Sequence, residues 1–522
     1  MTDRFIAIAP RVLLLATLWV LFGAARAADD GVAWLPAANN GDIDRAFAQA
    51  RSESKPVLLY WGAKWCPPCN QLKATLFNRH DFIERSRSLV AVEIDGDLPG
   101  AQKLGARFKV SGYPTMVLMR TDGAELMRLP GEAEAPQVLQ LLEFGLGGGR
   151  AAKDVLADAR AGKPLPGAEW RMLAFYSWIS DESQLLTAVE RPGVLAGLSV
   201  ACPRSEADSA TRLMLKALAD SDDGKGVKAD AALRQRARGW LGDPAVARAQ
   251  MDVLTNYAAE ITKALSTSGS ADRKAIVTAF DAALQRLQVD ATLSRADRLS
   301  ALGARVDLAR IDAAKSERHP HVAPALQQQV REASASADRE VTDGYERQAV
   351  ITAAAYMLAQ AGLWNESDAL LKANLAKSHS PYYLMSQLGS NARKLGRNDE
   401  ALRWYEEAFA RSEGPATRLQ WGAQYVTALV ELAPQDEARV ERAVTRMIDD
   451  AALDKGAFDG RSARSLARVD KQLVQWNRDG RHSAVLGRLR AQLQPVCGRL
   501  DGEPAARAAC DGTFRQATKL SA

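Results

Sequence analysis

The sequence predicts an α/β domain near its N-terminus, followed by a large all-α region of stacked helical hairpins. Three observations support this fold class. Strand-like and helix-like segments alternate over residues 42–146, which is typical of an α/β domain. From residue 150 onward, apolar residues recur at the helical spacing of 3.6 residues, and no strand–turn–strand pattern is convincing. Small residues in this second region recur at a fixed interval, which indicates an α-solenoid.

Composition excludes several classes of protein. A length of 522 residues favours a chain of about three domains. The net charge is only +5 and no long basic run occurs, so we expect no nucleic-acid partner. A hydrophobic content of 47% and a charged content of 25% are those of folded globular proteins. Five cysteines are too few for a disulfide scaffold of this length.

The first segment, residues 1–27, has the pattern of a signal peptide. Arg4 and Arg11 precede an almost unbroken apolar run from Val12 to Ala25, which ends in Ala-Arg-Ala. The alternative is an uncleaved anchor, although Pro10 and Arg11 interrupt the longer apolar stretch. No later stretch approaches 18 apolar residues, so we expect no membrane span after cleavage. We therefore expect a periplasmic protein in a compartment that permits disulfides.

The α/β domain is expected over residues 28–146. Its predicted strands contain buried-type apolar runs, and the last two flank Thr-Asp-Gly at 121–123, a hairpin signal. Its predicted helices carry apolar residues on one face. In chain order the expected elements are helix 42–51, strand 57–61, helix 70–79, strand 89–94, strands 115–119 and 125–129, and helix 135–144.

Four glycines at 145–149 predict a Gly-rich linker over 147–160. If so, residues 28–146 should fold without the rest of the chain. Beyond the linker we expect a helical domain over 161–345, repeats over 346–420 and a C-terminal helical segment over 421–522.

The predicted repeat consists of two helical hairpins with small residues at matching positions. Ala369, Ala373 and Ala376 match Ala401, Tyr405 and Ala408, 32 residues later. A glycine precedes each set, at 362 and 396, and a proline follows each set, at 381 and 415. This pattern resembles the tetratricopeptide repeat, although any amphipathic helical hairpin could share it.

The chemistry-bearing motif is Trp65-Cys66-Pro67-Pro68-Cys69. Two cysteines at this spacing are either a redox pair or half of a metal site. Zinc requires about four ligands, but no second such motif exists and only His80 lies nearby in sequence. We therefore expect no metal, and no cofactor beyond the cysteine pair itself.

The redox interpretation has a physical basis. A helix that begins near Cys66 directs its positive end at that sulfur, which favours the nucleophilic thiolate. Cys69, one turn further, is then the resolving thiol. Pro67 suits the first helical turn. Because Pro67 and Pro68 lack an N–H, we expect a thiolate pKa that is lowered less than in strongly oxidising proteins, which favours reductase or isomerase activity.

Residues 42–146 resemble the thioredoxin fold through three segments. The run from Tyr60 to Cys69 resembles the active-site strand and loop, Val110 to Thr115 resembles the segment with the cis-proline, and Glu93-Ile94-Asp95 resembles the end of the central strand. The Gly-Tyr-Pro-Thr form is common in protein disulfide isomerase. Exported context and a leading helix make bacterial periplasmic thiol:disulfide interchange domains the most similar group.

This resemblance implies a substrate site. Pro114 would be cis and face the cysteine pair, and the Tyr113 backbone would pair with an extended substrate strand. Trp65, Pro67 and Pro68 would flank the substrate. One departure concerns the Asp and Lys that thioredoxins usually bury behind the resolving cysteine. Those positions fall on Tyr60 and Ala91, and Glu93 is a weak candidate to replace them.

The remaining cysteines are Cys202, Cys497 and Cys510. The last two are separated by 12 residues that include two glycines and a proline. We expect a structural disulfide between them, with free thiols or a second redox pair as alternatives. Cys202 is left over and is expected to be buried and inert.

The leading hypothesis is an exported thiol:disulfide oxidoreductase acting on protein cysteines, with a helical-repeat arm that binds proteins and a redox partner that the sequence does not identify. The alternatives are a periplasmic adaptor whose redox domain only docks, and a chaperone-like isomerase. The direction of electron flow depends on the reduction potential of the pair, because 30 mV changes the equilibrium about tenfold.

Overall fold

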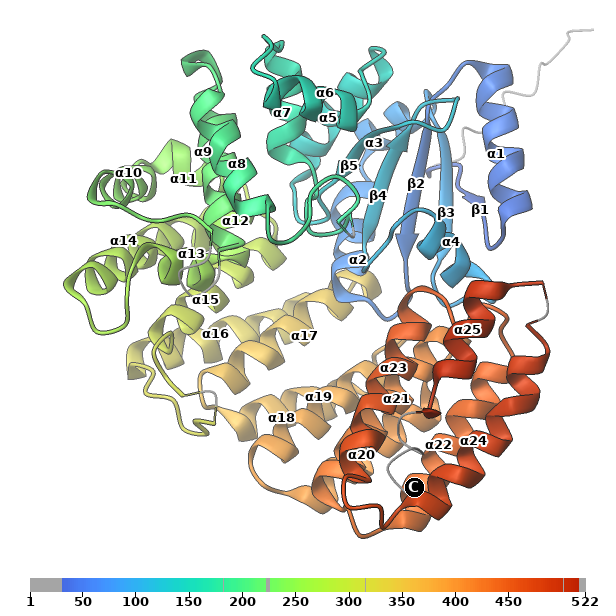
Figure 1. The fold of residues 1–522 in the computed structure, drawn as a ribbon. Coiled ribbons are helices and arrows are strands. Elements are labelled where there is room, and N and C mark those ends of the chain that lie inside the picture. The colour runs from blue at the N-terminus through green and yellow to red at the C-terminus, as the bar shows by residue number, and fades with distance from the viewer. Residues whose placement is uncertain (1–30, 182, 222–225, 315, 501, 516–522) are drawn as a thin grey trace, which may run out of the picture.

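The computed structural model describes residues 31–181, 183–221, 226–314, 316–500 and 502–515. The predicted signal peptide, 1–27, lies outside these residues. In the described part of the chain, no helix is both long enough and apolar enough to cross a membrane. The predicted fold class is confirmed: a mixed sheet near the N-terminus is followed by helices (Figure 1).

The sheet has five strands in the order β1-β3-β2-β4-β5. β1, β3 and β2 are parallel, whereas β4 runs antiparallel to β2 and β5 antiparallel to β4. Every residue of the central strand β2 is buried. The strands are β1 (Leu35–Pro36), β2 (Val57–Gly62), β3 (Val90–Asp95), β4 (Thr115–Met119) and β5 (Glu125–Leu129).

Helices cover both faces of the sheet, because alternate residues of β2 point to opposite sides. Val57, Leu59 and Trp61 share one core with α1 and α4. Leu58 and Tyr60 face a second core that contains residues of α2, η1, α3 and α5. These helices are α1 (Asn40–Glu53), α2 (Pro67–Leu72), the π-helical turn η1 (Lys73–Phe77), α3 (His80–Ser86), α4 (Ala101–Arg107) and α5 (Ala135–Leu146).

The second core does not end with the sheet domain. It continues into α6 (Ala152–Arg160), α7 (Gly167–Phe175), α8 (Arg191–Ala201) and α9 (Ala207–Ala219). The 3₁₀ turn η2 (Arg204–Glu206) directly precedes α9. The Tyr176 hydroxyl also donates to Glu125 Oε1 at 2.7 Å. The predicted linker over 147–160 is therefore corrected. Only 147–151 lacks helical structure, because the glycines end α5 but the next residues form an amphipathic helix whose Val155 and Leu156 are buried.

This shared core changes the expectation for the isolated domain. A fragment of residues 31–146 should aggregate or fail to unfold cooperatively, because it leaves the apolar face beside α6 and α7 open to water. A fragment extended to residue 314 retains that cover, the apolar partners of α9 and Asp252 beside Arg212, so it should be soluble. Gel filtration and circular dichroism in urea would test both fragments. Equal cooperativity of the two fragments would contradict the shared core.

A second helical segment leads away from the sheet domain (Figure 1). It contains a separate core to which α9 to α15 contribute. Its helices are α10 (Ala231–Gly242), α11 (Pro244–Ala249), α12 (Met251–Asn256), α13 (Ala258–Leu265), α14 (Ala271–Gln288), α15 (Arg295–Ala309) and α16 (Pro324–Glu340).

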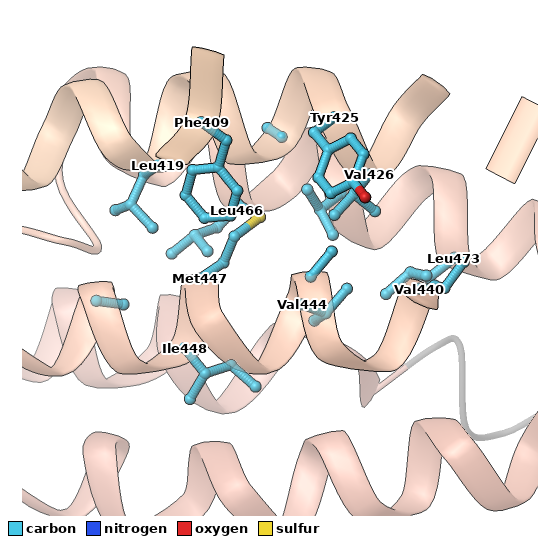
Figure 2. Packing of buried hydrophobic residues seen from close by; sticks show 14 of the residues in the cluster. Phe409, Leu419, Tyr425, Val426, Val440, Val444, Met447, Ile448, Leu466 and Leu473 are labelled. Atoms are coloured by element: carbon cyan, nitrogen blue, oxygen red, sulfur yellow. The ribbon is translucent and has the colours of Figure 1, made fainter. Parts of the chain in front are cut away.

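The arm, defined as α17 to α25, consists of consecutive packed helices. Figure 2 shows Phe409, Met447 and Leu466 meeting in its main core, from three different helices. The helices are α17 (Gly344–Gln360), α18 (Trp364–Asn374), α19 (Pro381–Lys394), α20 (Asn398–Arg411), α21 (Pro415–Leu432), α22 (Glu437–Ala452), α23 (Gly460–Trp476), α24 (Ser483–Gly498) and α25 (Pro504–Gly512).

The predicted repeat corresponds to the hairpins α17–α18 and α19–α20. Gly362 and Gly396 form the turns inside these hairpins with φ of 80° and 76°, a conformation that favours glycine. A Cβ on Gly389 would lie 2.8 Å from the Tyr405 ring, so this small residue permits α19 and α20 to approach closely. The region fits a repeat-like arm, and its identity as tetratricopeptide repeats stays a prediction.

The arm returns to the sheet domain and closes a ring (Figure 1). α17 packs against α2, and α23 packs against α4. The Gly100 N–H donates to Asp454 Oδ1 at 3.0 Å, and Lys103 pairs with Glu503. The redox-motif side of the sheet domain therefore faces the chain's own helices.

The structure pairs Cys497 of α24 with Cys510 of α25, and both are fully buried. We expect the Cys497→Ala/Cys510→Ala double variant to lose about 3 kcal/mol of unfolding free energy, because the disulfide restricts the unfolded chain. Urea unfolding would measure the loss, with Cys202→Ser as the control. Two free thiols in peptide mapping of the native protein would contradict the pairing.

Candidate active site

The cysteine pair lies where β2 leads into α2. Cys66 is the N-cap of α2, and Cys69 lies in its first turn; the two form a disulfide with a Cα–Cα distance of 5.2 Å. The Cys69 N–H donates to Cys66 Sγ at 3.2 Å. Because Pro67 and Pro68 lack an N–H, Cys69 supplies the first amide of the helix that can reach this sulfur. Cys66 is 2% exposed and Cys69 is 0% exposed.

Pro114 follows a cis peptide bond from Tyr113. Pro67, Pro68, Tyr113 and Pro114 line one cavity, so the two segments that the sequence paired do come together. The Tyr113 hydroxyl accepts a hydrogen bond from Gln102 Nε2 at 2.8 Å. Within the described residues, the backbone N–H and C=O of Tyr113 have no partner. A residue whose backbone N–H and C=O are both free can pair with an extended chain.

The positions of the usual buried Asp and Lys carry no ionised group. Tyr60 packs among Trp34 and Phe77, and burial raises the pKa of its phenol far above the usual value. Glu93 instead pairs with Lys73 at 3.4 Å on a partly exposed surface. Tyr60 therefore cannot accept the proton of the resolving cysteine at neutral pH, and Glu93 is engaged in an ion pair with Lys73.

Trp65, whose substrate-binding role stays a prediction, contacts the arm. Its indole N–H lies 2.9 Å from Asp97 Oδ2 and 2.8 Å from Thr417 Oγ1 on the arm. Its ring stacks on Tyr383 at 5.9 Å and meets Trp421 at 5.3 Å between centroids. The side chain expected to meet substrate thus contacts the chain's own helices.

Arg461 of α23 completes this contact, and no sequence pattern pointed to this residue. Its guanidinium pairs with Asp97 at 2.5 Å and lies over the rings of Trp65 and Tyr113, at 5.2 and 5.0 Å from their centroids. Its backbone N–H donates to Gln102 Oε1 at 2.8 Å. We name Trp65, Asp97, Thr417 and Arg461 the arm contact.

The other sulfur atoms lie apart from the pair. Cys202 is a free thiol at the end of α8, and burial raises its pKa to about 11. It is therefore protonated at neutral pH and a poor nucleophile. Cys497 and Cys510 belong to the far helices α24 and α25. Among the described residues, no group of three His, Cys, Asp or Glu side chains could hold a metal ion.

A buried cysteine pair at a helix N-terminus, beside a cis-proline and on this sheet, defines the class of thioredoxin-fold redox domains. Residues 43–146 match the family model of the thioredoxin-like domain. A thioredoxin of Mycolicibacterium smegmatis is 32% identical over 93 residues, which are 18% of this chain and 80% of that protein. The chain belongs to the thioredoxin family through this domain.

Two larger relatives carry the name thiol:disulfide interchange protein. DsbD of Pseudomonas fluorescens is 31% identical over 103 residues, 19% of this chain and 18% of the relative. DsbD 2 of Pseudomonas aeruginosa is 28% identical over 117 residues, 22% of this chain and 20% of the relative. The chain thus spans about a fifth of the length of these relatives.

Proposed function

We propose that the chain is an exported thiol:disulfide oxidoreductase that acts on the cysteines of other proteins, its clients. The observation that carries the proposal is the placement of Cys66 at the N-terminus of α2, beside Pro114 and the free Tyr113 backbone. A domain that only docks requires neither the cysteine pair nor this backbone edge. The signal-peptide pattern of residues 1–27 supports the periplasm as the compartment.

The exchange proceeds in two steps. The Cys66 thiolate of the reduced protein attacks one sulfur of a client disulfide, the client S–S bond breaks, and its second sulfur leaves as a thiolate. The Cys69 thiol then gives its proton to the client thiolate released in the first step and attacks the Cys66 sulfur. This step forms the Cys66–Cys69 disulfide seen in the structure and releases the first client sulfur as a thiolate. Two electrons pass to the client, and a dithiol donor restores the pair by the reverse exchange.

The test uses the full-length protein, dithiothreitol as donor and a short cysteine peptide bound by a disulfide to thionitrobenzoate. Release of the coloured thiol measures the exchange. Wild type and Cys202→Ser should accelerate the release, whereas Cys66→Ala should fall to the background rate. Equal rates for wild type and Cys66→Ala would refute the oxidoreductase and leave the adaptor hypothesis.

A further inference from the structure

A chamber of about 590 Å³ lies beside the redox motif. One wall is the motif side of the sheet domain, with Pro67, Pro68 and Pro114. The opposite wall comes from helices far along the chain, including α9, α15, α17 and α19. The volume lies within the range of pockets that bind ligands, about 300–1,000 Å³. A folded protein domain is far too large to enter such a space.

The arm contact closes a different side of the motif. Trp65 precedes Cys66 in the sequence, whereas Pro67 follows it. The Trp65 ring packs against Tyr383 and Trp421, and its indole N–H is hydrogen-bonded to the arm. A client therefore meets helices wherever it approaches Trp65, whereas the chamber leaves room next to Pro67 and Pro114. Of these two sides, the chamber is therefore the one with room beside the residues that flank Cys66.

Part of the helical wall of the chamber is apolar. α17 contributes Ala349, Ala353 and Tyr356, which are spaced by one turn and so share a face. Tyr356 is 55% exposed and Ile179, also in the wall, is 56% exposed. Large apolar side chains that remain exposed inside a concave site are suited to cover apolar side chains of a ligand.

Among the polar groups in the wall, Gln387 of α19 has an acceptor that stays unused. Gln387 donates from Nε2 to the Thr352 carbonyl at 3.2 Å, but its Oε1 is buried and, among the described residues, accepts no hydrogen bond. A buried acceptor without a partner costs about 1–3 kcal/mol until a donor arrives. Together with the free N–H and C=O of Tyr113 across the chamber, it offers hydrogen bonds to an amide chain from both walls.

Charges in the wall do not favour one sign. Arg191 is paired with Asp220 at 2.5 Å. Lys216 donates to the Tyr176 carbonyl at 3.1 Å, and Asp297 accepts from Gln71 at 3.1 Å. A site with both signs and an apolar face suits an uncharged or mixed segment better than a strongly charged one.

We infer that this chamber is a substrate site in which the helical wall, with Tyr356 and Gln387, selects a single extended, cysteine-bearing segment of an unfolded protein over the surface of a folded one. The inference rests on the proposed function and names its substrate class. The apolar face of α17 covers side chains on one side of the segment, and the Tyr113 backbone and Gln387 bind its main chain. The thiol–disulfide step itself is unchanged.

The first experiment compares substrates on the wild-type protein. The probes are an uncharged eight-residue cysteine peptide carrying thionitrobenzoate, a folded protein with the same group on a surface cysteine, and glutathione carrying the same group, so that the leaving thiol is the same in all three. The peptide should react with a kcat/KM at least about tenfold above that of the folded protein. The glutathione adduct should be slower than the peptide, because it lacks the side chains that the α17 face covers. Equal rates for the peptide and the folded protein would overturn the inference while leaving the oxidoreductase intact.

The second experiment fills the chamber. Ala353→Trp should lower kcat/KM for the peptide by about tenfold or more, and its circular dichroism spectrum should match that of wild type. Ala335→Trp, on an exposed position of α16, is the matched control. Gln387→Leu should raise KM for the peptide about fivefold with unchanged kcat, the value of one hydrogen bond. If Ala353→Trp and Ala335→Trp have the same peptide kinetics, the chamber is not the substrate site; if wild type itself does not react with any probe, the proposed function fails.

Discussion

Cys69→Ser should leave Cys66 joined to client proteins in stable mixed disulfides, and Cys66→Ser should yield none. The helix N-terminus and the Cys69 amide stabilise a thiolate at Cys66. Without the Cys69 sulfur, the mixed disulfide has no internal thiol to release it. Cys69 is fully buried, so it cannot attack a client when Cys66 is absent. Turnover of peptide disulfides should fall to background in both variants.

The measurement is non-reducing electrophoresis after expression of each variant in a periplasm, followed by identification of the trapped chains. Cys202→Ser, which leaves the pair intact, is the control for overall thiol content. The roles of the two cysteines would be reversed if Cys66→Ser trapped as many proteins as Cys69→Ser. If the trapped proteins are captured while they are unfolded, and not after they have folded, this result would also support the chamber as the substrate site.

The largest stability effect is expected at the ion pair between Arg212 of α9 and Asp252 of α12. The side chains are 0% and 1% exposed, and the Arg212 guanidinium also lies 3.8 Å from the Phe175 ring centroid. Burial alone would raise the pKa of Asp252, but the charge and hydrogen bonds of Arg212 lower it below its usual value. The pair stabilises the fold above the unfolded carboxyl pKa, and this contribution is lost as the pH falls through the folded pKa.

Asp252→Asn should therefore cost about 3–5 kcal/mol at neutral pH, because it leaves a buried guanidinium without its counter-charge. The double variant Arg212→Met/Asp252→Leu should cost less than this single change. Arg393→Ala, which breaks an exposed pair with Glu431, should cost below about 1 kcal/mol. Urea unfolding at neutral pH measures all three. A loss at Asp252→Asn no larger than that at Arg393→Ala would show that the buried pair is not a major contribution.

Local patterns predicted much of the sheet domain. The predicted strands 115–119 and 125–129 are the observed β4 and β5. They could be predicted because two apolar runs on either side of a Thr-Asp-Gly turn are typical of a β-hairpin. β1 was not predicted, since two residues carry no periodicity. The helix predicted over 70–79 instead begins at Pro67, turns π-helical at Lys73 and ends at Phe77. The prediction of a linker over 147–160 was wrong because it considered only the glycines. Glycines indicate where one helix ends, but they carry no information about the apolar face of the helix that follows.

The cysteine motif and the cis-proline could be predicted from the sequence, since each depends on a short run of contiguous residues. The arm contact was not, because it joins Trp65 to Thr417 across 352 positions. Arg461 and Asp97 are ordinary charged residues in sequence, and only the return of the arm to the sheet domain brings them together. The chamber depends on the same return, so no local pattern could have indicated it.

The long separation between Trp65 and Thr417 also sets an order of events during synthesis. A ribosome adds about 5–20 residues per second, so the 352 residues between these partners require about 20 to 70 s. The ring cannot close before its last helices exist. In each new molecule, the sheet domain and its cysteine pair are thus synthesised well before the helices of the arm, and the contact between Trp65 and Thr417 can form only when most of the chain exists.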